Sequence, residues 1–287
     1  MRVSMGEIPR IGLDVLRGLG LGYSIAWRGR EMIAWSEAVH GCALKYMRLN
    51  SAKLVEAHKL GFEILEERTV SIRVNARGQS LLTIGPRAID LAIAYARRGS
   101  VGCVKLENVN GLFMSHALLA SAAERGHSCV ALFASSSKRD PFEATGMTIS
   151  NLDGKCRRVM AFRSSINGKN TIFSLRDDLF HQNDLNRRVR CFAEETKCTS
   201  HNWLEIICFP IGKMLSAPAG VTQQAKCHLC LTGAGLENWV VFEKHDYRFQ
   251  QAMIKGIDVA SEDFKAFWEM SKLIRIPNSQ RSQIQAG

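Results

Sequence analysis

The feature that most constrains this fold is the alternation of strand-like and helix-like segments between residues 67 and 134. Residues 67–82 place β-branched side chains at every second position (Val70, Ile72 and Val74), which is the period of a strand with one buried face. The short apolar runs at 101–106 and 129–134 are typical of buried strands. A helical segment stands between each strand and the next. This order predicts an α/β fold with right-handed crossovers and a mixed, partly parallel sheet.

The two helical segments have recognisable ends. The segment 85–99 carries apolar residues at helical spacing and arginines in its expected last turn, and Gly99 is its expected stop. We expect Pro86 in the first turn of this helix, where a missing backbone N–H is tolerated. The segment 112–125 is rich in alanine, and Gly126 is expected to close it.

The chain before this core is predicted to be helical. Residues 4–49 show apolar residues at helical spacing, interrupted by glycines, which predicts a helical hairpin whose second arm ends near His40 and Gly41. A third helix is expected at 51–60. We therefore expect an N-terminal helical subdomain over residues 1–60, followed by an α/β core over residues 61–146.

The pattern weakens after the polar loop at 135–146. We expect residues 147–287 to complete the α/β core and to add C-terminal helices, so that the whole chain forms one continuous fold. The expected elements are strands near 157–163, 170–174 and 227–232, and helices near 203–216, 246–257 and 261–273.

Composition excludes several classes of protein. The chain has 287 residues and is 46% hydrophobic, which excludes a disordered or fibrous protein. Its net charge is +11, but the lysines and arginines are scattered, so we do not expect nucleic acid as a partner. No apolar run approaches the roughly 20 residues of a membrane span. The N-terminus does not resemble a signal peptide, and the nine cysteines are an odd number spread over a long chain. We therefore expect a cytoplasmic protein without a membrane segment.

His40 is the first candidate for chemistry. It stands in AVHGCALKYM at the expected end of a helix. An imidazole, whose pKa is ordinarily about 6.5, can carry a proton to or from a substrate oxygen near neutral pH. Alternatively, the ring interacts with the last carbonyls of the helix and the negative end of its dipole.

Asn108 and Asn110 are the second candidates. They follow the strand expected at 101–106, and open α/β sheets bind ligands beyond the carboxyl ends of their strands. Their amides could both donate to and accept from a ligand. The alternative is that Asn110 caps the next helix, and both roles are compatible.

A third candidate is a group of cysteines and histidines in the second half of the chain. Its members are Cys191, Cys198, His201, Cys208, Cys227, His228 and Cys230. The spacings are irregular, and only the interval from Cys227 to Cys230 is that of a zinc ligand pair. Cys208 lies in an apolar run and is expected in the core. We therefore expect no metal site.

Several stretches together resemble a known family. The order VSMGE, a helical hairpin ending in AVHG, RAIDLAIAYARRGSVGCVKLENVNGLF and ASAAERGHSCVALFAS resembles the type-2 malate/L-lactate dehydrogenases. The likeness covers residues 3–135 and concerns order and spacing more than identity. The tail FWEMSKLIRIPNSQRSQIQAG also resembles the end of this family and that of an uncharacterised bacterial domain family. The family uses NADH or NADPH on small 2-oxo, 2-hydroxy or imino acids, and the resemblance implies a homodimer.

The resemblance assigns roles residue by residue. His40 matches the family's catalytic histidine, and Asn108 and Asn110 match asparagines of its second motif, so we expect them, with Gly111, to contact the cofactor NAD(P)H. Gly41 and Lys45 are expected to contact the substrate. Lys45 is next to the position of the family's carboxylate-binding arginine, although on a helix it points about 100° away from that position.

The chain departs from the family pattern at five positions. The family's serine before the catalytic histidine falls on Val39, and its carboxylate-binding arginine falls on Leu44. Its second-motif histidine falls on Gly111, and a Thr-Asn pair is replaced by Phe133 and Ala134. A 2-oxo acid reductase needs a cation for the carboxylate as well as an acid for the oxygen. We therefore expect either a divergent NAD(P)-dependent oxidoreductase acting on a small-molecule acid, or a non-catalytic relative that binds a metabolite or a protein.

Overall fold

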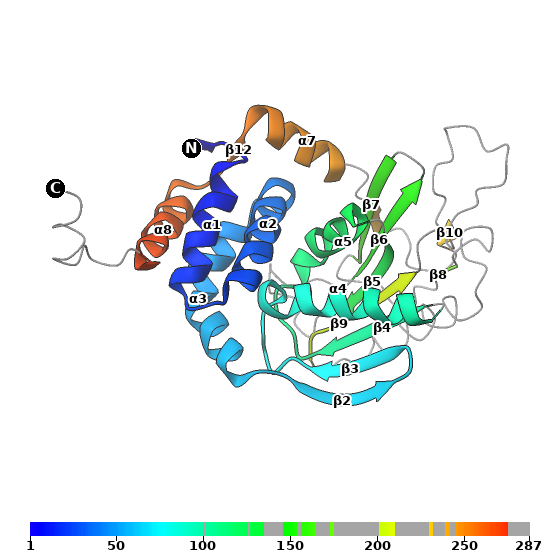
Figure 1. The fold of residues 1–287 in the computed structure, drawn as a ribbon. Helices are drawn as coiled ribbons and strands as arrows, with labels where there is room; N and C mark the ends of the chain where they lie inside the picture. The colour runs from blue at the N-terminus through cyan, green and yellow to red at the C-terminus, as the bar shows by residue number, and fades with distance from the viewer. Residues whose placement is uncertain are drawn as a thin grey trace. The chain divides into compact units, whose positions relative to one another are not determined.

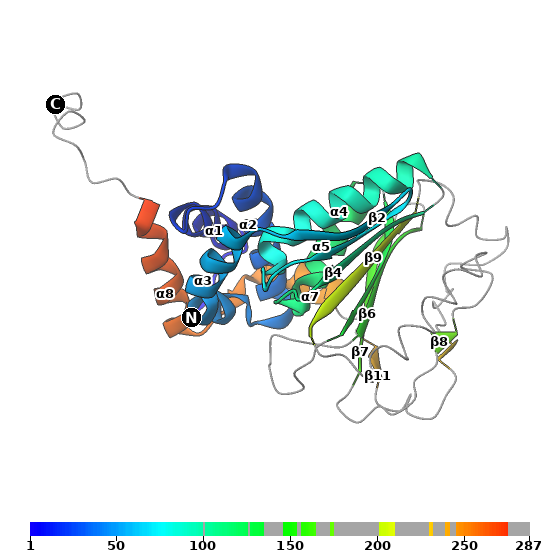
Figure 2. The same cartoon turned by 90° about the horizontal axis from the view of Figure 1, so that it is seen from below.

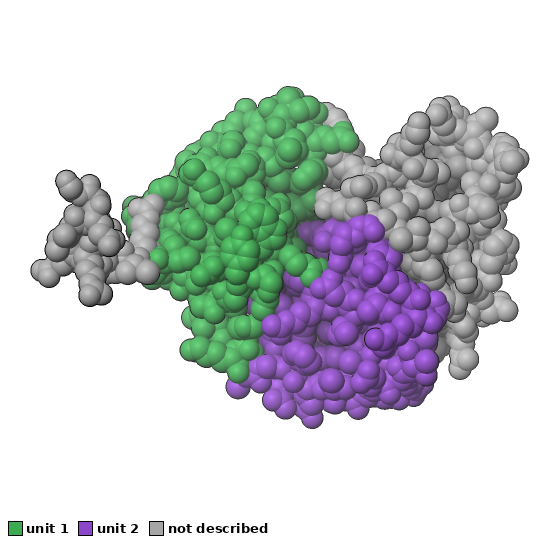
Figure 3. Space-filling model, in the orientation of Figure 1, with its two compact units in different colours: residues 1–59, 248–287 green, residues 60–247 purple. Residues whose placement is uncertain are grey.

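The computed structural model describes residues 1–99, 101–125, 127–134, 146–153, 156–164, 173–174, 201–209, 230–231, 239–241 and 245–274. The chain forms two compact units, coloured green and purple in Figure 3. Unit 1 contains residues 1–59 and 248–287, and unit 2 contains residues 60–247. No helix among the described residues is both long and apolar enough to cross a membrane.

Unit 1 is mainly helical (Figure 1). Its elements are β1 (Arg2–Val3), α1 (Glu7–Gly18), α2 (Tyr23–His40), α3 (Ala43–Leu60), most of α7 (His245–Lys255), β12 (Ile257–Asp258), α8 (Ser261–Ser271) and η3 (Lys272–Ile274). α1 packs against both α2 and α8. The apolar residues of α1 recur at helical spacing and are buried, which explains why this short helix is stable (Ile8, Ile11, Val15 and Leu16).

Unit 2 is built on an eight-stranded sheet with the order β11-β7-β6-β5-β9-β4-β3-β2. Its strands are β2 (Glu63–Arg68), β3 (Ser71–Asn75), β4 (Gly102–Glu107), β5 (Ser128–Ala134), β6 (Gly146–Asp153), β7 (Cys156–Ser164), β9 (Trp203–Phe209) and β11 (Trp239–Val241). β8 (Phe173–Ser174) and β10 (Cys230–Leu231) form a separate antiparallel pair. Within the described strands, β3 and β4 pair in parallel and every other pair in the large sheet is antiparallel. The prediction of a mixed, partly parallel sheet is confirmed.

Two helices connect the central strands. α4 (Leu81–Arg98) links β3 to β4, and the short η1 (Leu112–Met114) with α5 (Ser115–Glu124) links β4 to β5. The two helices contact each other, and Figure 2 shows α4 lying along one face of the sheet. Their buried apolar side chains and those of the central strands form the core.

Two predictions about elements are wrong. Residues 203–209 form β9 rather than a helix, and β9 lies between β4 and β5. This strand is buried on both faces, so its sequence WLEIICF is apolar at every position except Glu205 and does not alternate. Pro86 is not in the first turn, because α4 begins five residues earlier, where the Ser80 hydroxyl accepts a hydrogen bond from the Leu82 amide.

Candidate functional site

The first group of candidate residues lies in unit 2, beyond the carboxyl ends of β3 and β4. The two strands run in parallel, so the turns that follow them meet at one edge of the sheet. Backbone hydrogen bonds join these turns: the Ala76 amide donates to Glu107, and the Gly78 amide donates to Asn108, each at 2.7 Å. The edge is the position at which open α/β sheets bind ligands.

Asn110 holds the two turns together. Its backbone amide donates to Gln79 O at 2.9 Å, and its carbonyl accepts from the Leu81 amide at 2.9 Å. Its side-chain Nδ2 donates to Gly78 O at 2.8 Å, and its Oδ1 accepts from Asn202 Nδ2 at 3.4 Å. These contacts tie Asn110 to the loop before α4 and to the start of β9, and none of them caps the helix that follows it.

The backbone of this turn is in the left-handed region at two positions. Asn108 has a φ of 54° and Gly111 has a φ of 79°. Asparagine and glycine are the residues that adopt this conformation at least cost, which accounts for both residue types here. A histidine, which the resemblance would place at 111, would be strained at this φ.

Two buried polar atoms beside these turns lack a hydrogen-bond partner among the described residues. Gln79 is 1% exposed, and its Oε1 accepts from the Thr83 hydroxyl at 3.3 Å, but its Nε2 has no acceptor. Ser115, the first residue of α5, is fully buried, and its hydroxyl has no partner either. Unsatisfied buried polar atoms are costly, so both are candidates for contact with a ligand.

The expected absence of a metal site was based on residues that fall mostly outside the described part. Cys191, Cys198, Cys227 and His228 lie in segments that the structure does not describe. Of the others, Cys208 is fully buried in β9 as expected, and His201 Nε2 lies 3.7 Å from a Glu107 carboxylate oxygen. Within the described ranges, no group of three histidine, cysteine or acidic side chains could hold a metal ion.

The second group of candidates lies in unit 1, at the end of α2. His40 is the last residue of this helix and is half-buried. Gly41 follows with a φ of 66°, and its amide donates to Glu37 O at 2.8 Å, which ends the helix in a left-handed turn. His40 is therefore displayed at a helix end whose backbone geometry is fixed.

Aromatic and basic side chains surround this helix end. Trp35 meets the His40 ring edge-on at a centroid distance of 6.4 Å, and it stacks on Phe249 of α7 at 6.2 Å. The neighbouring Arg248 donates from Nη1 to Val39 O at 2.9 Å. A cation at this point is favourable because the C-terminal end of a helix carries partial negative charge.

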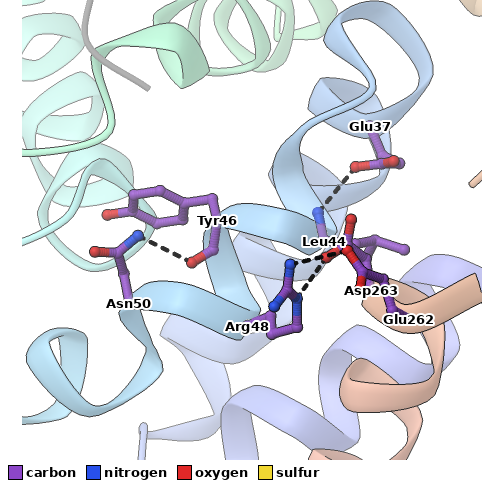
Figure 4. Close-up of polar contacts among 7 residues, drawn as sticks. All are labelled: Glu37, Leu44, Tyr46, Arg48, Asn50, Glu262 and Asp263. Carbon is purple, nitrogen blue, oxygen red and sulfur yellow. Dashed lines mark hydrogen bonds and ion pairs between the residues drawn. The ribbon is translucent and has the colours of Figure 1, made fainter. Parts of the chain in front are cut away.

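Figure 4 shows polar contacts made by residues of α2, α3 and α8, of which the Glu37 contact supports the turn between α2 and α3. The Glu37 carboxylate accepts a hydrogen bond from the Leu44 amide at 2.9 Å. Burial raises the pKa of the Glu37 carboxyl above its ordinary value, although hydrogen bonds from the Leu44 and Ala43 amides act in the opposite direction. Farther along α3, Arg48 Nε lies 2.6 Å from Asp263 Oδ1 and Nη2 lies 3.2 Å from Glu262 Oε1.

The remaining predicted residues differ in exposure. Lys45 is exposed on α3, whereas Leu44, at the position of the family's arginine, is fully buried. His40, Gly41 and Lys45 thus belong to unit 1, and Asn108, Asn110 and Gly111 belong to unit 2.

Comparisons with known proteins support the fold. No protein-family model and no curated protein matches this chain. Sulfolactate dehydrogenase from Methanocaldococcus jannaschii has a similar structure (TM-score 0.62, 12% identity, 96% of this chain and 98% of that chain covered). So do malate dehydrogenase from Pyrococcus horikoshii OT3 (0.59, 11%, 96% and 96%) and delta1-piperideine-2-carboxylate reductase from Pseudomonas syringae pvar. tomato (0.56, 14%, 94% and 99%). At these identities the similarity establishes a shared fold, as the resemblance in the sequence implied.

Sequence reasoning missed three residues that the structure places beside the predicted ones. Arg248 contacts Val39 at the end of α2, although the two residues are 209 positions apart in the sequence. A local sequence pattern cannot predict such a contact. Gln79 and Ser115 were hidden because their types are common in turns and caps. The sequence signal that could have indicated them is position: Gln79 follows a strand, and Ser115 stands where the next helix starts.

Proposed function

We propose that this protein is an NAD(P)H-dependent oxidoreductase that reduces small 2-oxo or imino acids, or oxidises the corresponding 2-hydroxy or amino acids. One observation carries the proposal: the fold of nearly the whole chain is shared with three dehydrogenases or reductases named for such acids. His40, at the end of α2, is the residue to which the proposal assigns the proton transfer. Both the cofactor and the substrate class belong to the proposal. We propose in addition that the protein is cytoplasmic and forms a homodimer.

The residues of unit 2 fit a nicotinamide cofactor chemically. Gln79 Nε2 and the Ser115 hydroxyl are buried polar groups with no partner among the described residues, and the carboxamide and phosphates of such a cofactor offer the acceptors that they lack. Asn108 and Asn110 belong to the turn whose backbone is hydrogen-bonded to Gly78, Gln79 and Leu81, and Gly111 follows it in the chain. When bound, the cofactor would supply the hydride.

His40 would supply the proton. In reduction of a 2-oxo acid, the carbonyl carbon gains a hydride and the carbonyl oxygen gains the proton of the His40 imidazolium, so that the C=O double bond becomes C–OH. The imidazole then takes a proton from solvent. In the reverse direction the neutral ring accepts the hydroxyl proton. Trp35 limits the orientations available to the ring.

The proposal is tested by nucleotide binding and turnover. The purified protein should gain thermal stability with NADH or NADPH at millimolar concentration, because a ligand that binds only the folded state shifts unfolding. His40→Ala should retain this shift but lower kcat with the best acid of a 2-oxo acid panel by roughly 10²- to 10⁴-fold. His58→Ala, which changes another histidine in the last turn of a helix, should keep wild-type kcat. Absence of a shift with either nucleotide would refute the proposal.

A second candidate function is a non-catalytic protein of the same fold that binds a metabolite or a protein. The observation in its favour is that three positions that are polar in the family are apolar and buried here (Val39, Leu44 and Phe133). These side chains offer a ligand no polar group. Turnover that is unchanged in His40→Ala would favour this candidate.

A further inference from the structure

Arg248 brings a guanidinium group to the helix end that carries His40. Its Nη1 donates a 2.9 Å hydrogen bond to Val39 O, the carbonyl of the residue just before His40. From this contact we infer that Arg248 holds the carboxylate of the substrate, and this inference rests on the proposed function. The substrate would then be a 2-oxo acid whose ionised carboxylate is required for binding.

The guanidinium retains the donors needed for this role. It carries five N–H groups in a planar fork, and the Val39 carbonyl occupies one of them. Within the described part of the chain Arg248 forms no ion pair, and the residue is exposed. The remaining donors match the two oxygens of a carboxylate, which arginine binds in a bidentate manner.

A second contact, made by the residue after Arg248, also holds α7 against α2. The next residue, Phe249, stacks on Trp35 at 6.2 Å, and Trp35 in turn meets the His40 ring at 6.4 Å. α7 therefore contacts the end of α2 through both an aromatic stack and a hydrogen bond. A cation that is hydrogen-bonded on one side, on a helix that is itself in contact through Phe249, loses less freedom when it binds an anion than an unanchored side chain would.

Other cations of unit 1 are placed less favourably. Both the Nε and the Nη2 of Arg48 are engaged by Asp263 and Glu262. Lys45 lies on the exposed side of α3, and position 44 is filled by a fully buried leucine. Arg248, by contrast, hydrogen-bonds the residue adjoining His40.

Electrostatics at the end of α2 also require a cation for an acidic substrate. The carboxyl end of a helix carries partial negative charge, which repels a carboxylate. Arg248 offsets this charge at the Val39 carbonyl. In a 2-oxo acid the carboxylate carbon is bonded directly to the carbonyl carbon, so holding the carboxylate also orients the carbonyl oxygen that His40 protonates.

The test compares two substitutions of equal charge change on one helix. Arg248→Gln should raise KM for pyruvate, or for the best substrate among pyruvate, glyoxylate and oxaloacetate, by roughly 10- to 100-fold. kcat should change less than KM. When the carboxylate of the substrate is replaced by an uncharged amide, KM should differ little between wild type and Arg248→Gln. Lys255→Gln removes an exposed cation from the last turn of the same helix and should behave as wild type. Oxamate should stabilise the nucleotide-bound wild type but not nucleotide-bound Arg248→Gln.

The outcomes separate this inference from the proposed function. If wild type binds nucleotide and turns over the acid while Arg248→Gln keeps its KM, the inference is overturned and the proposed function stands. If wild type shows neither nucleotide binding nor turnover, both are overturned. Should Arg248→Gln fail to fold, Arg248→Lys keeps the charge but loses the fork, and a KM equal to that of wild type would then overturn the bidentate role.

Discussion

A buried carboxyl group, Glu37, fixes the turn that presents His40. Its carboxylate accepts the Leu44 amide at 2.9 Å, and its backbone carbonyl accepts the Gly41 amide at 2.8 Å. The residue is only 4% exposed, and burial raises the pKa of its carboxyl. The ionised form is therefore less favourable in the folded protein than in the unfolded chain.

This shift in pKa predicts how stability depends on pH. Because the folded-state pKa of Glu37 is raised, its contribution to stability is present below the ordinary carboxyl pKa and is lost as the pH rises through the raised value. The glutamine of Glu37→Gln cannot ionise, so this variant does not lose stability in this way. As the pH rises, its free energy of unfolding should therefore increase relative to that of wild type, whatever constant difference the substitution itself causes. Urea unfolding from about pH 4 to about pH 8 measures the difference.

An exposed glutamate provides the control for this experiment. Glu56 lies on the exposed side of α3, and Glu56→Gln is the control for the same chemical change away from the buried turn. A constant difference between wild type and Glu37→Gln would contradict the prediction, since it would mean that Glu37 titrates alike in the folded and unfolded states.

Among the elements, α4 and β4 approach each other unusually closely at Gly102. A Cβ at this position would overlap Ala92 O and would lie 2.5 Å from Ala96 N and 2.9 Å from Tyr95 Cβ. The first two of these are backbone atoms of α4, which cannot rotate away. Glycine therefore sets the distance between the helix and the strand that ends at the candidate cofactor turn.

Gly102→Ala should destabilise unit 2 severely. Relief of the overlap requires movement of a whole helix, and overpacking of this kind costs about 3 kcal/mol or more. Chemical denaturation monitored by circular dichroism measures the loss. Gly6→Ala is the matched control, since a Cβ there would have no neighbour within 4 Å. Equal free energies of unfolding for the two variants would contradict the prediction, because they would show that α4 can move away from β4 without loss of stability.

The central elements could be predicted because local pattern and tertiary position agree. Residues 85–96 of α4 bury an apolar stripe at helical spacing, and β4 is a short apolar run between turns. β9 could not be predicted as a strand, because a strand buried on both faces and a buried helix show the same apolar run. Its place between β4 and β5 depends on pairing across distant segments, which local spacing does not encode.

Part of the candidate site could be predicted, because there too the local sequence pattern agrees with the position in the structure. His40 and Asn110 stand at the ends of elements, where the sequence itself marks a helix stop and a strand-to-helix turn. Arg248 meets Val39 only through packing of α7 on α2, so its type and neighbours contain no sign of the contact. The same holds for Gln79, whose burial follows from its pairing with Asn110.

At the scale of the whole molecule, unit 1 joins distant parts of the chain. β1 pairs with β12, so that Val3 lies opposite Ile257, and the N-terminal ammonium donates to Val259 O at 2.9 Å. Phe267 of α8 is fully buried, and a Cβ at Gly12 of α1 would lie 3.6 Å from its ring. The N-terminal helices are therefore completed by residues from the other end of the chain.

Phe267→Ala should weaken unit 1 by about 3–5 kcal/mol, the usual cost of removing a buried aromatic side chain. Thermal and urea unfolding of the full chain measure it, and Lys265→Ala, at an exposed position of the same helix, is the control. A chain ending at residue 247 should lose the helical signal of α1–α3. Retention of that signal would show that the first 59 residues are stable by themselves.

The insertion of β9 between β4 and β5 also determines when the protein can fold during its synthesis. The ribosome releases the chain from the N-terminus, and β4 and β5 emerge before residues 203–209 have been made. Until then the edges of both strands that β9 will pair with remain open, and such edges invite association with other chains. Unit 1 is completed later still, because β1 pairs with β12 and α1 packs against α8, and both partners are synthesised after β9. The nascent protein thus depends on protection of its sheet edges until most of the chain has emerged.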